Sequence, residues 1–123
     1  MDKIIQKGIR GIFMDVQIVS MKSDFFKALA HPTRVRILER LAKCGNEVCV
    51  CELIDELGIE QSNLSQHLSI LRKQQIITST KVGLKVMYRI KYPEVLTILE
   101  NVQRILAQQF QEGEALMRHL ADR

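Results

Sequence analysis

The sequence predicts a mainly α-helical fold with one small β-hairpin. Apolar residues recur at helical spacing along several separate stretches of the 123-residue chain. Residues 76–91 instead place alternating β-branched and polar residues on either side of Gly83, as in a hairpin. No Pro-rich or Gly/Ser-rich segment interrupts the chain. We therefore expect a single domain over residues 1–123.

The two ends of the chain are predicted to form amphipathic helices, over residues 1–20 and 92–120. A small core needs one apolar helix for cover, so the second apolar stripe is expected to meet another subunit. This predicts a C2 homodimer joined through its terminal helices, the alternative being that both helices fold back on their own core. The stripes, spaced mostly three and four apart, are Ile5, Ile9, Ile12, Val16 and Val19 at one end and Tyr92, Val95, Leu96, Leu99, Val102, Leu106 and Phe110 at the other.

A further helix is predicted to begin at Pro32, because proline at the first helical position loses no hydrogen bond. Val35, Leu38 and Leu41 or Ala42 give this helix a core-facing stripe. Its basic side chains either bind phosphate or lie on a solvated face: Arg34, Arg36 and Arg40.

Residues 50–73 are predicted to form a helix-turn-helix unit, and the stretch from Cys49 to Leu57 carries the apolar stripe of its first helix. Gly58 stands where a left-handed C-terminal cap would fall. In the second helix, residues 60–73, Leu64, Leu68 and Leu71 form one apolar stripe. In such units the second helix enters the DNA major groove. The first helix has its own stripe at Val50, Leu53, Ile54 and Leu57.

The other face of the second helix carries short hydrogen-bonding side chains and almost no carboxylates. Gln and Asn can pair with an adenine edge, and Ser with a base edge or a phosphate oxygen. A merely solvated helix would more often carry Glu and Lys. We therefore predict contacts to base edges from Ser62, Asn63, Ser65 and Gln66, and helix-end or backbone contacts from Gln61 and His67.

The hairpin over residues 76–91 is predicted to be a basic wing. No acidic residue lies between Lys73 and Glu94, whereas several basic residues do. Lys81 and Lys85 are expected to bind DNA phosphates, with Arg89 near the tip. The formal net charge of +4 and the pI near 9.1 also suit a polyanionic partner. The fold expected is thus a winged helix-turn-helix.

The apolar stretches and the cysteine count together indicate where in the cell the protein is located. No segment is long and apolar enough to cross a membrane, and the charged N-terminal stretch does not read as a signal peptide. Three cysteines cannot all pair within one chain, which favours free or metal-binding thiols. These features predict a cytoplasmic protein.

Four segments together resemble the ArsR/SmtB family of winged-helix metalloregulatory repressors, and the resemblance covers roughly residues 23–92. It implies a homodimer that binds a pseudo-palindromic operator and releases it when an inducer binds, with no cofactor needed for DNA binding. His31 departs from the family, which usually has Asp or Glu there, and this departure concerns a helix cap. The matching segments are 28–38, 48–53, 57–72 and 81–90.

The Cys49-Val50-Cys51 sequence resembles the Cys-Val-Cys box through which arsenic-sensing members of this family bind their inducer. The resemblance implies arsenite or antimonite first and a soft divalent ion such as cadmium or lead second. Residues two apart on a regular helix point in nearly opposite directions, so the first helical turn must be distorted for both thiolates to share an ion. Cys44 is the remaining candidate for a third ligand, although burial as a small apolar residue is its commoner role.

Alternative functions remain open at this point. The same fold can serve as a repressor that is independent of metal or responds to oxidation of its thiols. A protein-interaction module is disfavoured by the polar helix and the basic wing. A thiol enzyme would need a base or a Cys-x-x-Cys pair beside a pocket, and neither is visible. We therefore do not expect an enzyme, and His119 near Glu112 and Glu114 gives no convincing zinc site.

Overall fold

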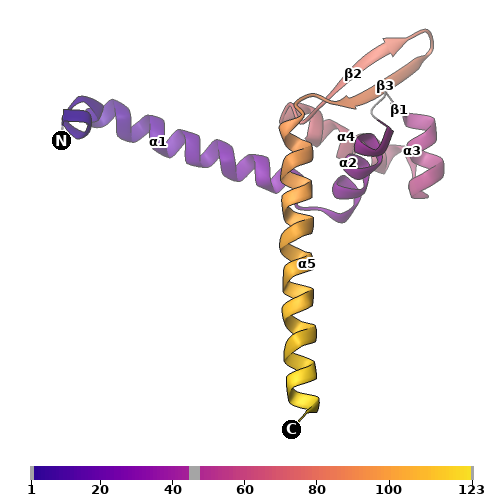
Figure 1. The fold of residues 1–123 in the computed structure, drawn as a ribbon. Helices are drawn as coiled ribbons and strands as arrows, with labels where there is room; N and C mark the ends of the chain where they lie inside the picture. The colour runs from indigo at the N-terminus through magenta and orange to yellow at the C-terminus, as the bar shows by residue number, and fades with distance from the viewer. Residues whose placement is uncertain (1, 45–47, 123) are drawn as a thin grey trace.

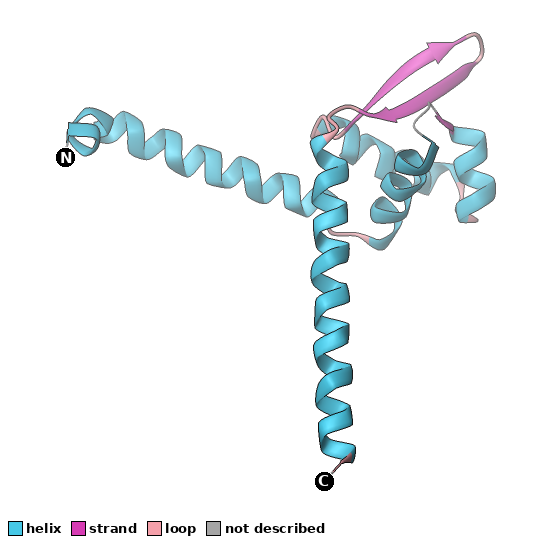
Figure 2. Cartoon of the chain, in the orientation of Figure 1, coloured by secondary structure: helices cyan, strands magenta, loops and turns pink. Residues whose placement is uncertain are grey.

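The computed structural model describes residues 2–44 and 48–122, and the side chains of residues 10–43 and 48–122. Helices dominate, and one small antiparallel sheet projects from them (Figure 2), which confirms the predicted fold class. The elements in chain order are α1 (Asp2–Leu29), α2 (Pro32–Cys44), β1 (Val48–Cys49), α3 (Val50–Leu57), α4 (Gln61–Lys73), β2 (Ile77–Val82), β3 (Lys85–Ile90) and α5 (Glu94–Ala121).

The first helix is longer than predicted. It was expected to end near residue 20, but α1 continues without a break to Leu29 and is 28 residues long. The extension brings Ala28 into the core, and Phe25 and Leu29 pack against it. Pro32 begins α2 as predicted. Just before it, Nδ1 of His31 accepts a hydrogen bond from the Thr33 backbone N–H at 3.1 Å, so His31 caps the helix in place of a carboxylate.

The helix-turn-helix consists of α3 and α4. Gly58 has φ of 63° and its N–H donates to the carbonyl of Ile54, which is the left-handed cap that was predicted. In α4 the predicted stripe of Leu64, Leu68 and Leu71 is buried. These leucines share one core with the following buried residues of other elements: Ile37, Leu38, Leu41, Val48, Leu53, Ile76, Ile77 and Val95.

The sheet has three strands, in the order β1-β3-β2. The hairpin of β2 and β3 was predicted, and Gly83 adopts φ of 62° in its turn. The short strand β1 was not predicted. It pairs antiparallel with β3, with Val48 opposite Tyr88 and Cys49 opposite Met87. The prediction that one helix carries both cysteines is therefore wrong: Cys49 has extended backbone (ψ of 148°), and α3 begins at Val50, where the helix-turn-helix unit was predicted to begin.

The terminal helices leave the core in different directions, α1 to one side and α5 downward in Figure 1. The first part of α5 covers the core through Val95 and Leu99. Farther along, its apolar residues are exposed, as are those along α1. Among the described residues, no helix is both long and apolar enough to cross a membrane.

Candidate DNA interface and thiol site

The polar face of α4 is open to solvent. Its N-terminal cap residue Glu60 makes no side-chain capping bond, and the first three residues of the helix are exposed. The apolar stripe on the opposite side anchors this orientation, since Leu64 is fully buried. Neutral hydrogen-bonding groups therefore project together from one side of the helix. The exposed residues are Gln61, Ser62, Asn63, Ser65 and Gln66.

His67 does not belong to this exposed face, which corrects the prediction that it contacts DNA. The residue is only 8% exposed. Its Nδ1 lies 3.1 Å from Nη1 of Arg34, and its ring centroid lies 4.4 Å from that of His31. Burial, followed by the nearby His31 and Arg34, lowers the pKa of His67. His67 thus serves to join α4 to the start of α2.

Arg34 was predicted either to bind phosphate or to lie on a solvated face, and the structure places it instead at a junction of three elements. Its Nε donates to the carbonyl of Ala28 at 2.6 Å, and its Nη2 donates to the carbonyl of Lys27 at 3.2 Å. These carbonyls lie in the last turn of α1, where helical carbonyls lack intrahelical partners. With its contact to His67, Arg34 links α1, α2 and α4.

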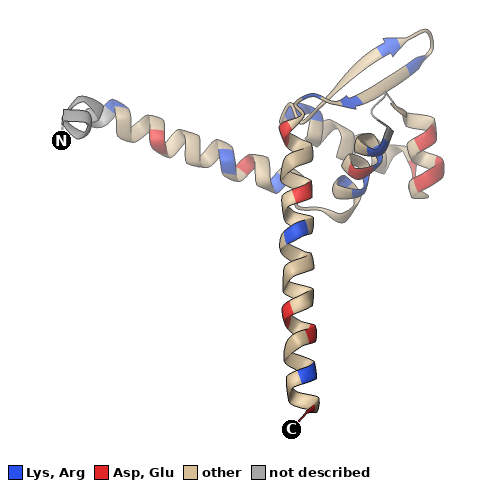
Figure 3. Ribbon diagram, in the orientation of Figure 1, with Lys and Arg blue, Asp and Glu red and all other residues tan. Residues whose placement is uncertain are grey.

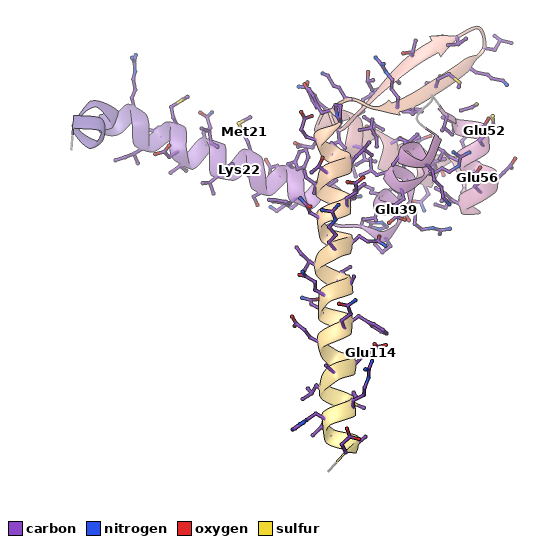
Figure 4. The ribbon with its side chains drawn as sticks, viewed as in Figure 1. Met21, Lys22, Glu39, Glu52, Glu56 and Glu114 are labelled. Atoms are coloured by element: carbon purple, nitrogen blue, oxygen red, sulfur yellow. The ribbon has the colours of Figure 1, made fainter. Side chains whose placement is uncertain are left out.

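Arg40 joins α2 to α3. Its Nη2 donates to Oε1 of Glu56 at 2.9 Å and lies 3.7 Å from Oε2 of Glu52, while its Nε donates to Oε2 of Glu56. The guanidinium lowers the pKa of Glu56. Glu52 and Glu56 both project from α3, the acidic element of the core (Figures 3 and 4). This pairing engages the Arg40 guanidinium with two carboxylates of α3.

The wing carries exposed cations. Lys81 and Lys85 are both exposed, on adjacent strands beside the Gly83-Leu84 turn. Lys81 is paired with Val86, and Lys85 with Val82, so the two lysines emerge on opposite faces of the hairpin near its tip. Arg89 pairs with Thr78, farther from the tip than predicted. Figure 3 shows the basic residues on the hairpin and the acidic ones on α3.

The two described thiols meet at the start of α3. Cys49 is buried and Cys51 is exposed, and their Sγ atoms lie 2.6 Å apart. Cys49 is also the N-cap of α3, and its Sγ accepts a hydrogen bond from the Cys51 backbone N–H at 3.4 Å. Because Cys49 precedes the helix, the near-opposite directions expected for residues two apart on a helix do not apply. Because the backbone of Cys49 is extended, its Sγ atom can lie next to that of Cys51.

The two thiols differ in acidity. The hydrogen bond from the Cys51 thiol, the Cys51 backbone N–H and the charge of Lys85 lower the pKa of Cys49. The same thiol hydrogen bond raises the pKa of Cys51, with burial and the Cys49 charge acting in the same direction. Cys49 is therefore the thiol that ionises first, and thiolates are the form that binds soft ions.

The predicted third ligand, Cys44, ends α2, but its side chain lies outside the described residues. Within the part of the chain that is described, no three His, Cys, Asp or Glu side chains are grouped to hold a metal ion. On α5, Glu114 lies on the segment that extends away from the core (Figure 4) and forms an ion pair with Arg118 at 3.5 Å.

Comparison with known proteins agrees with this arrangement. Residues 31–79 match the model of the bacterial regulatory protein, arsR family. The HTH-type transcriptional regulator Rv0081 of Mycobacterium tuberculosis (strain H37Rv), itself described as uncharacterized, is 35% identical over 104 residues, or 84% of this chain and 90% of the relative. Its crystal structure gives a TM-score of 0.71 over 77% of this chain and 94% of that one.

Two further relatives are named as repressors. The transcriptional repressor SmtB homolog of Synechocystis is 33% identical over 101 residues, covering 82% of this chain and 72% of the relative. The arsenical resistance operon repressor of Staphylococcus xylosus is 34% identical over 83 residues, covering 68% and 78%. These relatives regulate transcription and are not enzymes, as was expected of this chain. The chain belongs to the ArsR/SmtB family of helix-turn-helix transcriptional regulators.

Proposed function

We propose that this chain is a homodimeric repressor that binds operator DNA and releases it when a thiophilic ion binds Cys49 and Cys51. The observation that carries the proposal is that the thiol pair joins the helix-turn-helix to the hairpin. Cys51 lies in α3, which precedes α4 in the helix-turn-helix, and Cys49 pairs through β1 with the wing strand β3. An ion bound to the two thiols could therefore shift both the helix-turn-helix and the wing.

For DNA contacts, the exposed face of α4 supplies side chains suited to base edges and the wing supplies cations suited to phosphates. In this proposal Ser62, Asn63, Ser65 and Gln66 contact base edges, and Gln61 contacts the backbone. Lys81 and Lys85 bind phosphates on either side of the wing tip. His67 is left out because it is buried.

The homodimer is supported by the exposed apolar faces of α1 and α5. Val16 and Val19 of α1 and Leu106 and Phe110 of α5 are each more than half exposed. Apolar surface of this extent marks an interaction site in most proteins. A C2 dimer would place two copies of α4 about one DNA turn apart, at ~34 Å. Residues 1–123 would then act as one unit, with 1–20 and 92–120 in the dimer contact, and such a DNA-bound regulator is expected in the cytoplasm.

Trivalent arsenic or antimony is the first candidate inducer, and cadmium or lead the second. The paired thiols and the similarity to the arsenical resistance operon repressor support this order. Cys44 is the proposed third thiolate for a trivalent metalloid. Regulation requires ~1–3 kcal/mol of coupling between ion and DNA, and the coupling is reciprocal. DNA binding itself needs no ion.

An operator-release experiment tests the proposal. The operator is selected from a random DNA library, and arsenite, antimonite, cadmium and lead are titrated into the complex under reducing conditions. We expect DNA affinity to fall at least about fivefold, the lower end of ordinary allosteric coupling. Cys49→Ser and Cys51→Ser should bind DNA normally and ignore the ions. Unchanged DNA affinity at saturating concentrations of all these ions would remove the sensing part of the proposal.

A further inference from the structure

A third sulfur lies across the sheet from the thiol pair. Cys49 of β1 stands directly opposite Met87 of β3 in the antiparallel register. Directly opposed residues project from the same face of a sheet, with Cβ atoms about 4.5 to 5.5 Å apart. The thioether of Met87 therefore extends from the same face of the sheet as the Cys49 thiol. A sequence separation of 38 positions hides this neighbour from any local motif.

This face of the sheet is the one turned away from the main core. The preceding pair in the register, Val48 and Tyr88, packs in or against the apolar core, and successive strand residues alternate between faces. Cys49 and Met87 are accordingly not members of the cluster of packed apolar residues that contains Val48. Cys49 is nonetheless only 5% exposed, and Met87 is half-buried. Both side chains thus lie outside the central apolar cluster.

The dimensions suit one small ion. The Cys49 and Cys51 sulfurs are 2.6 Å apart, so both can bond to one ion once they separate to make room for it. Metal–thiolate bonds are about 2.3 Å long. The flexible Met87 side chain, with three rotatable bonds, can then complete a three-sulfur set.

We propose that Cys49, Cys51 and Met87 form a three-sulfur site for a soft monovalent cation of the Cu(I) class. The inference rests on the proposed thiol sensor and extends its range of inducers. Two thiolates and a neutral thioether are ligands that select Cu(I). Trivalent arsenic bonds to thiolates, which form when a thiol loses its proton. A thioether has no S–H proton to lose, so Met87 should not contribute to arsenite binding.

Such a site would also couple the ion to DNA. The ion would cross-link the N-terminus of α3 to strand β3, and Lys85 lies two residues from Met87 on the same face of that strand. Lys85 is close enough to Cys49 to lower its pKa. Fixing β3 against α3 would therefore shift the wing lysine that is proposed to bind DNA phosphate.

A binding experiment separates the thioether from the thiols. The reduced 123-residue protein is titrated anaerobically with Cu(I) in competition with a chromophoric Cu(I) chelator, and arsenite binding is measured in parallel by thiolate absorption. Met87→Leu should weaken Cu(I) binding by at least about 10-fold, since even hydrogen-bond partners of metal ligands contribute that much. It should leave arsenite binding unchanged. The matched control Met117→Leu, at an exposed position on α5, should change neither. Wild-type Cu(I) affinity in Met87→Leu would overturn the inference.

A second measurement does not depend on affinity. The methyl groups of the methionines are labelled with ¹³C and assigned through single Met→Leu variants, and Ag(I) is added as a redox-stable substitute for Cu(I). We expect the Met87 methyl resonance to shift at one equivalent while those of Met14, Met21 and Met117 stay in place. A stationary Met87 resonance would contradict the site. If Cu(I) binds through Met87 but no ion releases DNA, the sensor function fails and the site stands.

Discussion

The winged core, residues 32–90, and the terminal helices α1 and α5 bury their apolar side chains to very different extents. In the core Leu53, Leu64 and Leu71 are fully buried, whereas Phe13 of α1 and Phe110 of α5 are 70% and 69% exposed. All of these residues lie on regular helices with similar apolar spacing. The core thus completes itself within one chain, while much of the apolar surface of the terminal helices stays exposed, as the proposed dimer requires.

The same comparison assigns different tasks to the two regions. The proposed DNA contacts and both described thiols lie in the core, on α3, α4 and the sheet. The terminal helices carry none of them. They would instead set the distance between two cores, on which operator recognition depends. Changes in the core should therefore alter folding or base recognition, and changes in the helices should alter assembly.

The largest expected effect is on folding, from a cavity in the core. Leu64→Ala removes a fully buried side chain from α4 and should lower the free energy of unfolding by about 2 to 5 kcal/mol. Urea denaturation at fixed protein concentration measures this change. Leu116→Ala, on the exposed part of α5, is the control and should cost far less. Equal losses in the two variants would contradict the contrast between the regions.

Assembly should fail while each core stays folded in Leu106→Glu. Leu106 is 58% exposed on α5, and a carboxylate there would have to be buried without a partner in the dimer. We expect dimer affinity to fall at least about tenfold, as for residues central to an interface. Sedimentation velocity over a concentration series provides the measurement, and circular dichroism checks the fold. Gln108→Glu adds the same charge off the apolar stripe and should leave the dimer intact.

The connection between the regions depends on Arg34. Arg34→Met keeps much of the alkyl chain but removes the donors to the Lys27 and Ala28 carbonyls and to His67. The Lys27 carbonyl keeps the Ala30 backbone N–H as a donor, but the part-buried Ala28 carbonyl and His67 ring lose the Arg34 partner, which should cost about 1 to 3 kcal/mol. Hydrogen exchange should also rise in the last turn of α1. Arg36→Met, at an exposed position on the same helix, should have little effect on either quantity.

Base recognition and phosphate binding can be separated within the core. Gln66→Ala should change the preferred operator sequence at a cost of about 1 to 3 kcal/mol on the best site. Lys85→Ala should weaken binding to all sequences alike and reduce the salt slope by about one. Binding to an operator series at several salt concentrations distinguishes the two. If Gln66→Ala weakens every sequence equally, α4 is not reading bases through this residue.

The smallest effect concerns pH. The pKa of His67 is lowered in the folded protein. As the pH falls past the ordinary pKa of histidine, the unfolded chain therefore binds a proton at this residue before the folded chain does. The free energy of unfolding should therefore decrease as the solution is acidified from pH 7.5 to 5.5. His67→Gln should lose less stability over this interval than the wild type. His119→Gln, on exposed α5, should follow the wild-type profile.

Local patterns in the sequence were sufficient for much of the fold. The burial of Leu64, Leu68 and Leu71 follows from their spacing on a helix, and Gly58 and Gly83 occupy left-handed backbone that favours glycine. The neutral polar face of α4 could be identified for the same reason, because its residues lie close together in the sequence. Periodicity and backbone preference are properties of neighbouring residues, so they can be read without the structure.

Contacts between distant segments depended on the tertiary structure. Strand β1 is only two residues long, which is too short for a periodic pattern, and it exists because β3 offers an edge. This pairing takes Cys49 out of the helix and sets it opposite Met87. In the sequence His67 is indistinguishable from the other polar residues of α4. Only the folded chain shows that it contacts Arg34 and His31. The apolar stripes predicted both terminal helices, but which of their residues cover the core and which remain exposed was decided by the packing of the chain.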